Sequence, residues 1–171
     1  QVIATTGWFA IDVFAADLDG DDDADVLSAS IADSTIAWYE NTDGLGDFGP
    51  KQVITNTAYS ATSVFAADLD DDGDADVVSA STNDDTIAWY ENTDGLGDFG
   101  TKQVITTDAG GAQSVFVADL NGDTYPDVLS TSSDDKVAWY ANTNGAGGFG
   151  TQQVISTDTA TPFDVFAADL D

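Results

Sequence analysis

The chain repeats one unit of about fifty residues along its whole length. The tripeptide Gln-Val-Ile opens four successive copies, at Gln1, Gln52, Gln103 and Gln153. Residues 13–54 and 64–105 are identical at 35 of 42 positions. A period of this length is typical of solenoids and propellers, in which each unit buries its apolar surface only against its neighbours. The repeat therefore predicts a row of equal units.

Each unit holds four short apolar segments, separated by Gly- and Asp-rich turn sequences. In the first unit they span 13–18, 25–30, 35–41 and 48–54. They are rich in Val, Ile, Phe, Trp and Tyr and lack the helical period, which indicates strands. The first segment is apolar on both faces, as in stacked sheets, whereas Lys51 and Lys102 flank the last one, as expected of an exposed edge. We expect an all-β chain of four-stranded antiparallel propeller blades; the alternative is a linear stack of small sheets.

The units divide the chain into about three and a half blades within one array, residues 1–171. The complete blades are expected at 13–54, 64–105 and 115–155, with an outer strand of a preceding blade at 1–3 and an inner strand of an incomplete following blade at 165–171. Four blades are the smallest usual closed propeller. The chain is therefore interpreted either as a piece of a longer array or as a protein whose copies complete one another head to tail. Such contacts close into rings or continue as filaments.

The charge balance excludes several classes of partner. Thirty-two acidic residues against three basic ones give a net charge of −29, which disfavours nucleic acid and anionic membrane surfaces. No apolar run approaches eighteen residues, so membrane insertion is not expected. The chain has neither Cys nor His, which excludes disulfides, zinc–thiolate sites, cysteine nucleophiles and histidine bases.

Between the first two segments of each unit lies an acidic turn with oxygen-bearing side chains at positions 1, 3, 5 and 9. The candidate metal ligands, with position 7 included, are Asp17, Asp19, Asp21, Asp23 and Asp25; Asp68, Asp70, Asp72, Asp74 and Asp76; Asp119, Asn121, Asp123, Tyr125 and Asp127; and Asp169 and Asp171, which begin a further loop. Ca²⁺ takes six to eight oxygen ligands on a flexible loop, and this spacing wraps oxygens around one point. Because the side chain at position 7 varies, we expect its backbone carbonyl to be the donor. The pattern predicts about one Ca²⁺ per complete blade.

Two alternatives to this calcium loop were weighed. An EF-hand needs a bidentate Glu at position 12, but Ser28, Ser79 and Ser130 stand there and the flanking segments are strands. A merely solvated acidic turn, or the general acidity of a salt-adapted protein, would use Glu as freely as Asp. Only Glu40 and Glu91 are Glu, and the spacing recurs in all three units. The calcium interpretation is preferred.

The acidic turn, with the TIAWYENTDGLGDFG run that follows it, resembles the FG-GAP/VCBS family of propeller repeats, which also build the head of integrin α chains. The resemblance covers essentially the whole chain. It implies propeller blades, and it implies that Asp17, Asp19, Asp21 and Asp25 hold calcium, as do their later counterparts. Asp22 and Thr124 replace a usual Gly, and Asn121 replaces an Asp. The Gly-Ala-Pro part of the motif is absent, which favours the VCBS type over the integrin-like subgroup.

The repeats differ most in two connections that blade topology places on the face opposite the calcium loops. The link from one unit to the next spans 4–12, 55–63 and 106–114, and Trp8, Phe9 and Tyr59 are its candidate ligand-contacting residues. Such variation on a fixed scaffold is typical of a recognition surface, and equally of drift on an unconstrained one. Trp8 and Tyr59 could also fill gaps between blades, whereas Trp38, Trp89 and Trp139 recur once per unit and are expected in the core.

These observations predict a non-enzymatic, calcium-binding, extracellular or cell-surface repeat protein. Nearly every Asp cluster belongs to a calcium loop, and no Ser has a His or Lys base in a recognisable motif. The first hypothesis is a structural module that joins other copies of itself or further blades. The second is a lectin or adhesin that binds a glycan or a cell-surface protein through the variable face.

Overall fold

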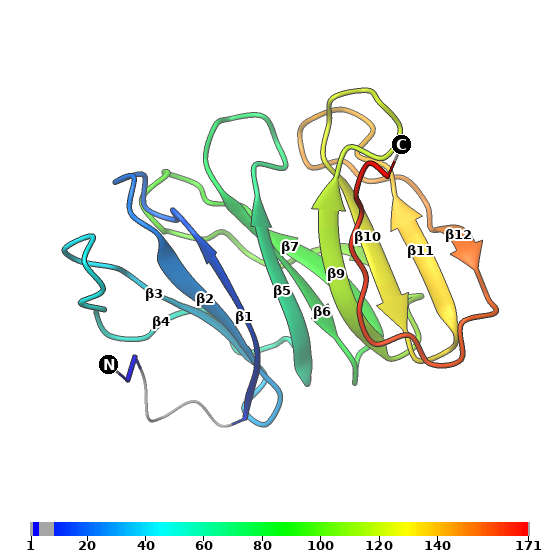
Figure 1. Cartoon of the computed structure of the whole chain (residues 1–171), viewed down its shortest axis with the longest axis horizontal. Helices are drawn as coiled ribbons and strands as arrows, with labels where there is room; N and C mark the ends of the chain where they lie inside the picture. The colour runs from blue at the N-terminus through cyan, green and yellow to red at the C-terminus, as the bar shows by residue number, and fades with distance from the viewer. Residues whose placement is uncertain (1, 4–8, 171) are drawn as a thin grey trace.

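A computed structural model describes residues 2–3 and 9–170, and in these residues three four-stranded antiparallel sheets form, one per repeat (Figure 1). Blade 1 consists of β1 (Ala10–Ala16), β2 (Asp25–Ser30), β3 (Thr35–Tyr39) and β4 (Gln52–Thr55). Blade 2 consists of β5 (Ala61–Ala67), β6 (Asp76–Ser81), β7 (Thr86–Tyr90) and β8 (Gln103–Thr106). Blade 3 consists of β9 (Ala112–Ala118), β10 (Asp127–Ser132), β11 (Lys136–Tyr140) and β12 (Gln153–Ser156).

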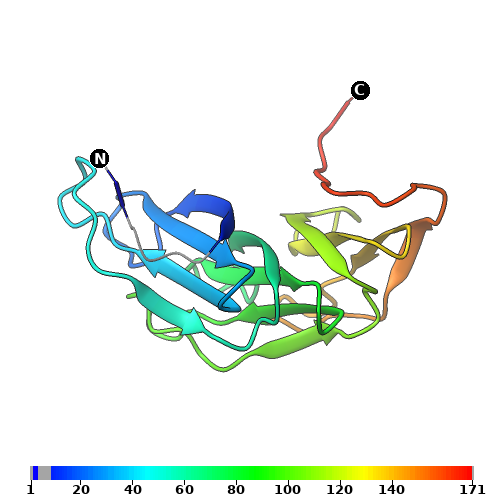
Figure 2. The ribbon, with the colours of Figure 1, turned by 90° about the horizontal axis from the view of Figure 1, so that it is seen from below.

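Within each blade the strands lie in sequence order, so every neighbour is joined by a turn. The inner strands β1, β5 and β9 lie side by side, while the outer strands β4 and β12 lie at the margins (Figure 1). Seen from below, the three sheets follow an arc (Figure 2). The prediction of an all-β array of propeller-like blades is thereby confirmed. The described residues include no helix long and apolar enough to cross a bilayer.

The three sheets have the same register. In blade 2, Val78 of the second strand pairs with Phe65 on one side and Trp89 on the other. Lys51 and Lys102 lie just before the outer strands β4 and β8. They pair with Asp33 at 3.4 Å and with Asp84 at 2.9 Å, in the turn between the second and third strands of the same blade.

The hydrophobic core lies between blades, because each sheet buries one face against the next sheet. We call the face toward the following blade the trailing face and the face toward the preceding blade the leading face. The first core joins the trailing face of blade 1 to the leading face of blade 2 and contains Leu18, Leu27, Ala29, Ile36, Trp38, Ala58, Ala61, Val64, Ala66, Val77 and Tyr90. The second joins blades 2 and 3 in the same way and contains Leu69, Val78, Ala80, Ile87, Trp89, Ala109, Ala112, Val115, Val117, Val128 and Tyr140.

The tryptophans of the third strands lock neighbouring blades together. The Trp38 ring lies against the α-carbon of Gly97, in the turn before the outer strand of blade 2, so closely that a Cβ there would clash with the ring. Trp89 lies in the same way against Gly147 of blade 3. The predicted core position of both tryptophans agrees with their burial. These glycines have positive φ angles as well, so two independent requirements select glycine.

A buried asparagine provides the polar link between blades. The Asn92 side-chain amide donates a hydrogen bond to the Leu18 carbonyl of blade 1 at 3.0 Å, and its Oδ1 accepts one from the Gly97 amide at 3.2 Å. Asn142 repeats the bond to the Leu69 carbonyl at 2.8 Å. Each asparagine thus holds both its own turn and the preceding blade.

The substitution Asn92→Ala should lower the free energy of unfolding by about 1–3 kcal/mol, because it leaves the buried Leu18 carbonyl without its donor. Asn41 is the matched control, since its amide donates within its own blade, to the Ala24 carbonyl at 3.3 Å. Urea denaturation of both variants isolates the inter-blade bond as a difference of about 1 kcal/mol. Equal destabilisation by the two substitutions would contradict this assignment.

Candidate metal centre

The first aspartate of each acidic turn shapes the loop that follows. The Asp17 carboxylate accepts hydrogen bonds from the backbone amides of Gly20 at 2.7 Å, Asp21 at 3.2 Å and Asp22 at 2.9 Å. Asp68 and Asp119 make the corresponding bonds in the second and third loops. A short acidic side chain that bonds to nearby backbone amides favours a tight turn over continued strand.

The sixth loop position explains the departures from the family pattern. Asp22, Gly73 and Thr124 stand there with φ angles of 69°, 99° and 78°, in the left-handed region. Glycine adopts this region freely, whereas other residues adopt it at a cost of about 1–2 kcal/mol. Asp22 and Thr124 therefore preserve the loop conformation without the residue that suits it best.

The ninth position clamps the loop to the sheet. Asp25 is fully buried, and its two oxygens accept hydrogen bonds from the Leu18 amide at 2.9 Å and the Asn41 amide at 2.8 Å. Asp76 and Asp127 make the same pair of bonds in blades 2 and 3. Sequence reasoning missed the asparagines on the other side of this clamp. Their once-per-repeat recurrence, at Asn41, Asn92 and Asn142, is the signal that could have found them.

Two groups of carboxylates could hold a metal ion. They are Asp17, Asp19 and Asp21 in the first loop and Asp68, Asp70 and Asp76 in the second. In each group one oxygen per residue lies within 4.8 Å of the others. The Oδ1 atoms of Asp19 and Asp70 are buried without a hydrogen-bond partner, which leaves an anionic oxygen in need of a cation. An all-oxygen donor set of this kind fits Ca²⁺.

The third loop carries a different donor set. Asn121 stands where the other loops have Asp19 and Asp70, so an amide oxygen replaces a carboxylate. Asp119 and Asp123 keep the turn geometry, with the Asp123 carboxylate accepting the Tyr125 amide at 2.9 Å. The third loop is thus built alike but carries one charge less at this position. In the incomplete last loop, Asp169 is exposed and Asp171 lies outside the described residues.

The side chains at position 7 point away from the clusters. The Asp23 carboxylate lies against Gly44, in the turn between β3 and β4, and Asp74 lies in the same way against Gly95. In blade 3 the Tyr125 ring takes this place. This arrangement is compatible with a backbone carbonyl as the position 7 ligand, which stays a prediction.

Burial and mutual repulsion disturb the titration of these groups. Burial, followed by the charges of Asp25 and Asp21, raises the pKa of Asp19 from 3.8 to about 6. Burial raises the pKa of Asp76 to about 7, although the amides of Asn92 and Leu69 act against it. The pKa values of Asp25, Asp70 and Asp127 are raised as well, again mainly by burial. The loops therefore concentrate negative charge that a bound cation would offset.

The variable connections meet at the end of the blades where the inner strands begin. The Asn83 amide bonds to the Tyr59 carbonyl at 3.0 Å, and the Tyr59 ring is exposed, as is Phe9. Trp8 lies outside the described residues. A cavity of about 240 Å³ opens beside the starts of the inner strands, among Thr62, Ser63, Gln113, Ser114 and other residues.

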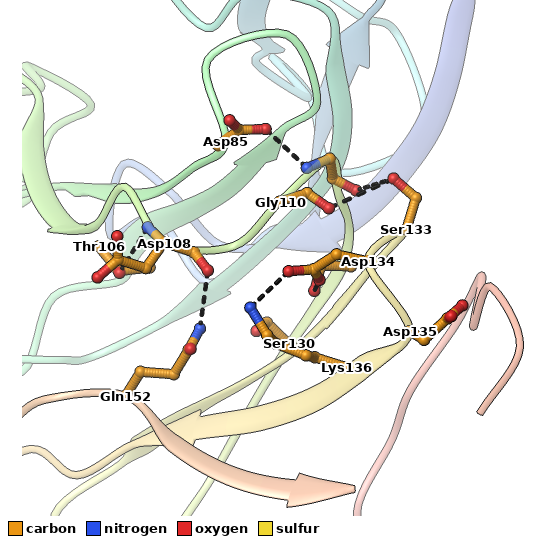
Figure 3. Close-up of polar contacts among 12 residues, drawn as sticks. Asp85, Thr106, Asp108, Gly110, Ser130, Ser133, Asp134, Asp135, Lys136 and Gln152 are labelled. Atoms are coloured by element: carbon orange, nitrogen blue, oxygen red, sulfur yellow. Dashed lines mark hydrogen bonds and ion pairs between the residues drawn. The ribbon is translucent and has the colours of Figure 1, made fainter. Parts of the chain in front are cut away.

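Figure 3 shows how these connections hold adjoining blades at this end. The Asp85 carboxylate accepts a hydrogen bond from the Gly111 amide at 2.7 Å. The Ser133 hydroxyl donates to the Gly111 carbonyl at 3.1 Å, and the Gln152 amide donates to the Asp108 carbonyl at 3.3 Å. Part of the variable sequence therefore serves inter-blade packing, while Tyr59 stays free to meet a ligand.

Comparison with known families finds three overlapping matches to the FG-GAP-like repeat, at residues 17–79, 68–130 and 119–171. No curated protein matches the chain. Among solved structures, an Agrocybe aegerita lectin described as recognising non-reducing terminal N-acetylglucosamine is similar, with a TM-score of 0.63 and 25% identity. That match covers 88% of this chain and 40% of the lectin chain.

A second similar structure is BBS1N from a complex with ARL6DN, soaked with lead, with a TM-score of 0.58 and 13% identity. The match covers 94% of this chain and 47% of that chain. At this identity the likeness shows the fold alone. The chain spans less than half the length of either structure.

Removing the unpartnered oxygens should weaken calcium-dependent stability. In the double variant Asp19→Ala/Asp21→Ala we expect a melting temperature lower by roughly 10 °C in millimolar calcium. The basis is the loss of one site worth about 4 kcal/mol at a thousandfold excess of ion over its dissociation constant. In excess chelator the same variant should melt no lower than the parent, because it relieves repulsion. Asp158→Ala, in an exposed position outside the loops, is the control for lost charge.

The raised pKa values predict opposite pH dependences with and without calcium. Since folding raises the pKa of Asp19 and Asp76, the folded state binds more protons than the unfolded state between about pH 4 and 7. In chelator, stability should therefore rise by a few degrees in melting temperature as pH falls from 8 to 5. In calcium, the increment due to the ion should shrink over the same range, because protons compete for the carboxylates. Melting curves at both pH values, with and without chelator, test the crossing.

Proposed function

Because the chain belongs to the FG-GAP-like repeat family, we propose that it is a non-enzymatic, calcium-binding module of an extracellular β-propeller assembly. In this proposal, Ca²⁺ occupies the acidic loops and fixes the blades, and the blades work as a rigid surface together with further blades or other copies. Calcium-rich extracellular surroundings suit loops of modest affinity.

The observation that carries the proposal is the buried, unpartnered carboxylate oxygen at the third position of the first two loops, on Asp19 and Asp70. The clamp at Asp25 is already satisfied by backbone amides, so the loop conformation does not itself need these oxygens. Carboxylates kept buried, close together and with raised pKa values lower the stability of the metal-free chain. A bound Ca²⁺ gives this arrangement a function.

The test is the light-scattering mass and the melting temperature of the 171-residue chain in millimolar calcium and then in excess chelator. We expect calcium to raise the melting temperature and to favour an assembly that chelator takes apart. A melting temperature indifferent to chelator would contradict the calcium role. A monomer with calcium-dependent melting would leave the calcium role intact and assign the missing neighbours to a longer chain.

A second candidate function is glycan binding, and the similarity to the N-acetylglucosamine-recognising lectin favours it. The exposed ring of Tyr59, its neighbours Phe9 and Trp8 on the variable connections, and the cavity beside the inner strands supply aromatic and polar groups of the kind that sugars contact. Here the calcium loops would serve only to hold the scaffold.

A glycan array, read in calcium, tests this candidate with terminal N-acetylglucosamine among its sugars. We expect selective binding that falls at least tenfold in Trp8→Ala or Tyr59→Ala, because each removes an aromatic contact. Leu45→Ala is the matched control, since Leu45 is an equally exposed apolar residue in the turn between β3 and β4. Absence of binding to every sugar would count against the lectin function.

A further inference from the structure

Blade 1 exposes a surface that the other two blades bury. Val64 and Val115 lie on the leading faces of blades 2 and 3, and only 3% and 4% of their surfaces are exposed. Val13 occupies the same position in blade 1 and is 64% exposed, because the described residues place no blade in front of it. The leading face of blade 1 is therefore half of an interface that forms twice within the array.

Blade 3 exposes the other half. Leu69 on the trailing side of blade 2 is fully buried under blade 3, whereas Leu120 at the same position of blade 3 is 36% exposed. Trp139 is likewise only half-buried, although Trp38 and Trp89 are buried. The trailing face of blade 3 thus carries the residues that receive a following blade.

Residues 161–170 already follow the path of a fourth inner strand across this trailing face. The Thr161 amide bonds to the Asp135 carboxylate at 2.7 Å, as the Gly111 amide bonds to Asp85 one blade earlier. The Ser114 hydroxyl bonds to the Asp164 carboxylate at 2.9 Å. However, residues 162–170 form no strand ladder, and Phe166 is 73% exposed. The segment covers the face without completing a blade.

The same eight residues occur at both ends of the array. Residues 164–171 read Asp-Val-Phe-Ala-Ala-Asp-Leu-Asp, and residues 12–19 read the same. In blade 1 the strand β1 is paired with β2 along its length, from Ala10 to Ala16. Strand β1 of another molecule could therefore make the side-chain contacts of residues 164–170 and bring three further strands with it.

We propose that a second copy of this chain docks the leading face of its blade 1 on the trailing face of blade 3, with β1 taking the place of residues 164–170. The inference rests on the proposed propeller-module function and names its partner. The occupant is a second copy because the open surface of blade 1 repeats the surfaces that blades 2 and 3 already pack against their neighbours. The contact is heterologous, so it closes a ring or continues as a filament.

The internal interfaces fix the register of this contact. Asn41 of one copy takes the role of Asn92 and Asn142 and donates to the Leu120 carbonyl of the other. Gly46 of the first copy lies against Trp139 of the second, as Gly97 lies against Trp38. The space in front of Gly46 is open in the single chain.

The first test is the light-scattering mass of the full chain in millimolar calcium, alone and with Val13→Asp. We expect the parent mass to be at least twice that of one chain. The variant should weaken association roughly a hundredfold or more, because it buries an unpaired carboxylate in the contact. Val13 is exposed in the single chain, so the variant should fold. Val53→Asp is the control, because Val53 is 57% exposed and its equivalent Val104 stays 55% exposed beside a neighbouring blade.

A mixing experiment tests the head-to-tail geometry. Val13→Asp keeps an intact trailing face, and Leu120→Asn keeps an intact leading face, so each variant alone should be monomeric. An equimolar mixture should form one-to-one dimers and nothing larger. Association of Val13→Asp with itself as strong as that of the parent would overturn the proposal, as would a mixture that stays monomeric.

The outcome also separates this inference from the function on which it rests. A parent chain that stays monomeric at its highest soluble concentration, but whose melting temperature falls in chelator, would overturn the docking and leave the calcium module standing. The missing neighbours would then be further blades of a longer chain or an unrelated protein. A melting temperature unaffected by chelator would instead contradict the calcium function, whatever the mass.

Discussion

The structure depends on burial between blades. Each four-stranded sheet is too thin to enclose a core, so its apolar side chains are removed from water only where the next sheet covers them. Trp38 is buried by a turn of blade 2, and Leu18 by the same neighbour, so neither residue is stabilised by its own blade alone. A repeat array of this kind gains stability with every neighbour and loses it at each open end.

The acidic loops work against this burial, and their position makes them effective. The loop aspartates are held between the inner and second strands by backbone amides, close to the Leu18 and Leu69 carbonyls that receive the inter-blade bonds. Charge repulsion within a loop therefore strains the segment that joins two blades. If calcium offsets that repulsion, as we propose, it stabilises the inter-blade contacts together with the loop. Calcium and neighbouring blades would then act on one equilibrium between folded array and unfolded chain.

The variable end of the blades combines structural and exposed residues. Gly111, Ser133 and Gln152 differ from their counterparts in other repeats but tie blades 2 and 3 together. Sequence variation therefore does not by itself distinguish a recognition surface from an alternative way of packing. Tyr59 differs from these residues because its ring faces solvent while its backbone supports the neighbouring turn.

The sequence by itself determined the repeat, the four strands of each blade and the acidic loops, because strand pattern, turn chemistry and Asp spacing are local and recur almost unchanged. It also placed Trp38 and Trp89 in the core. Only the tertiary structure decided which loop oxygens are used up, since Asp25 is satisfied by amides from two separate segments whereas Asp19 is not. Likewise, only the packing of one blade on the next reveals the role of Asn92. Its partner Leu18 lies 74 residues away, and no local pattern specifies a contact between segments so distant in the chain.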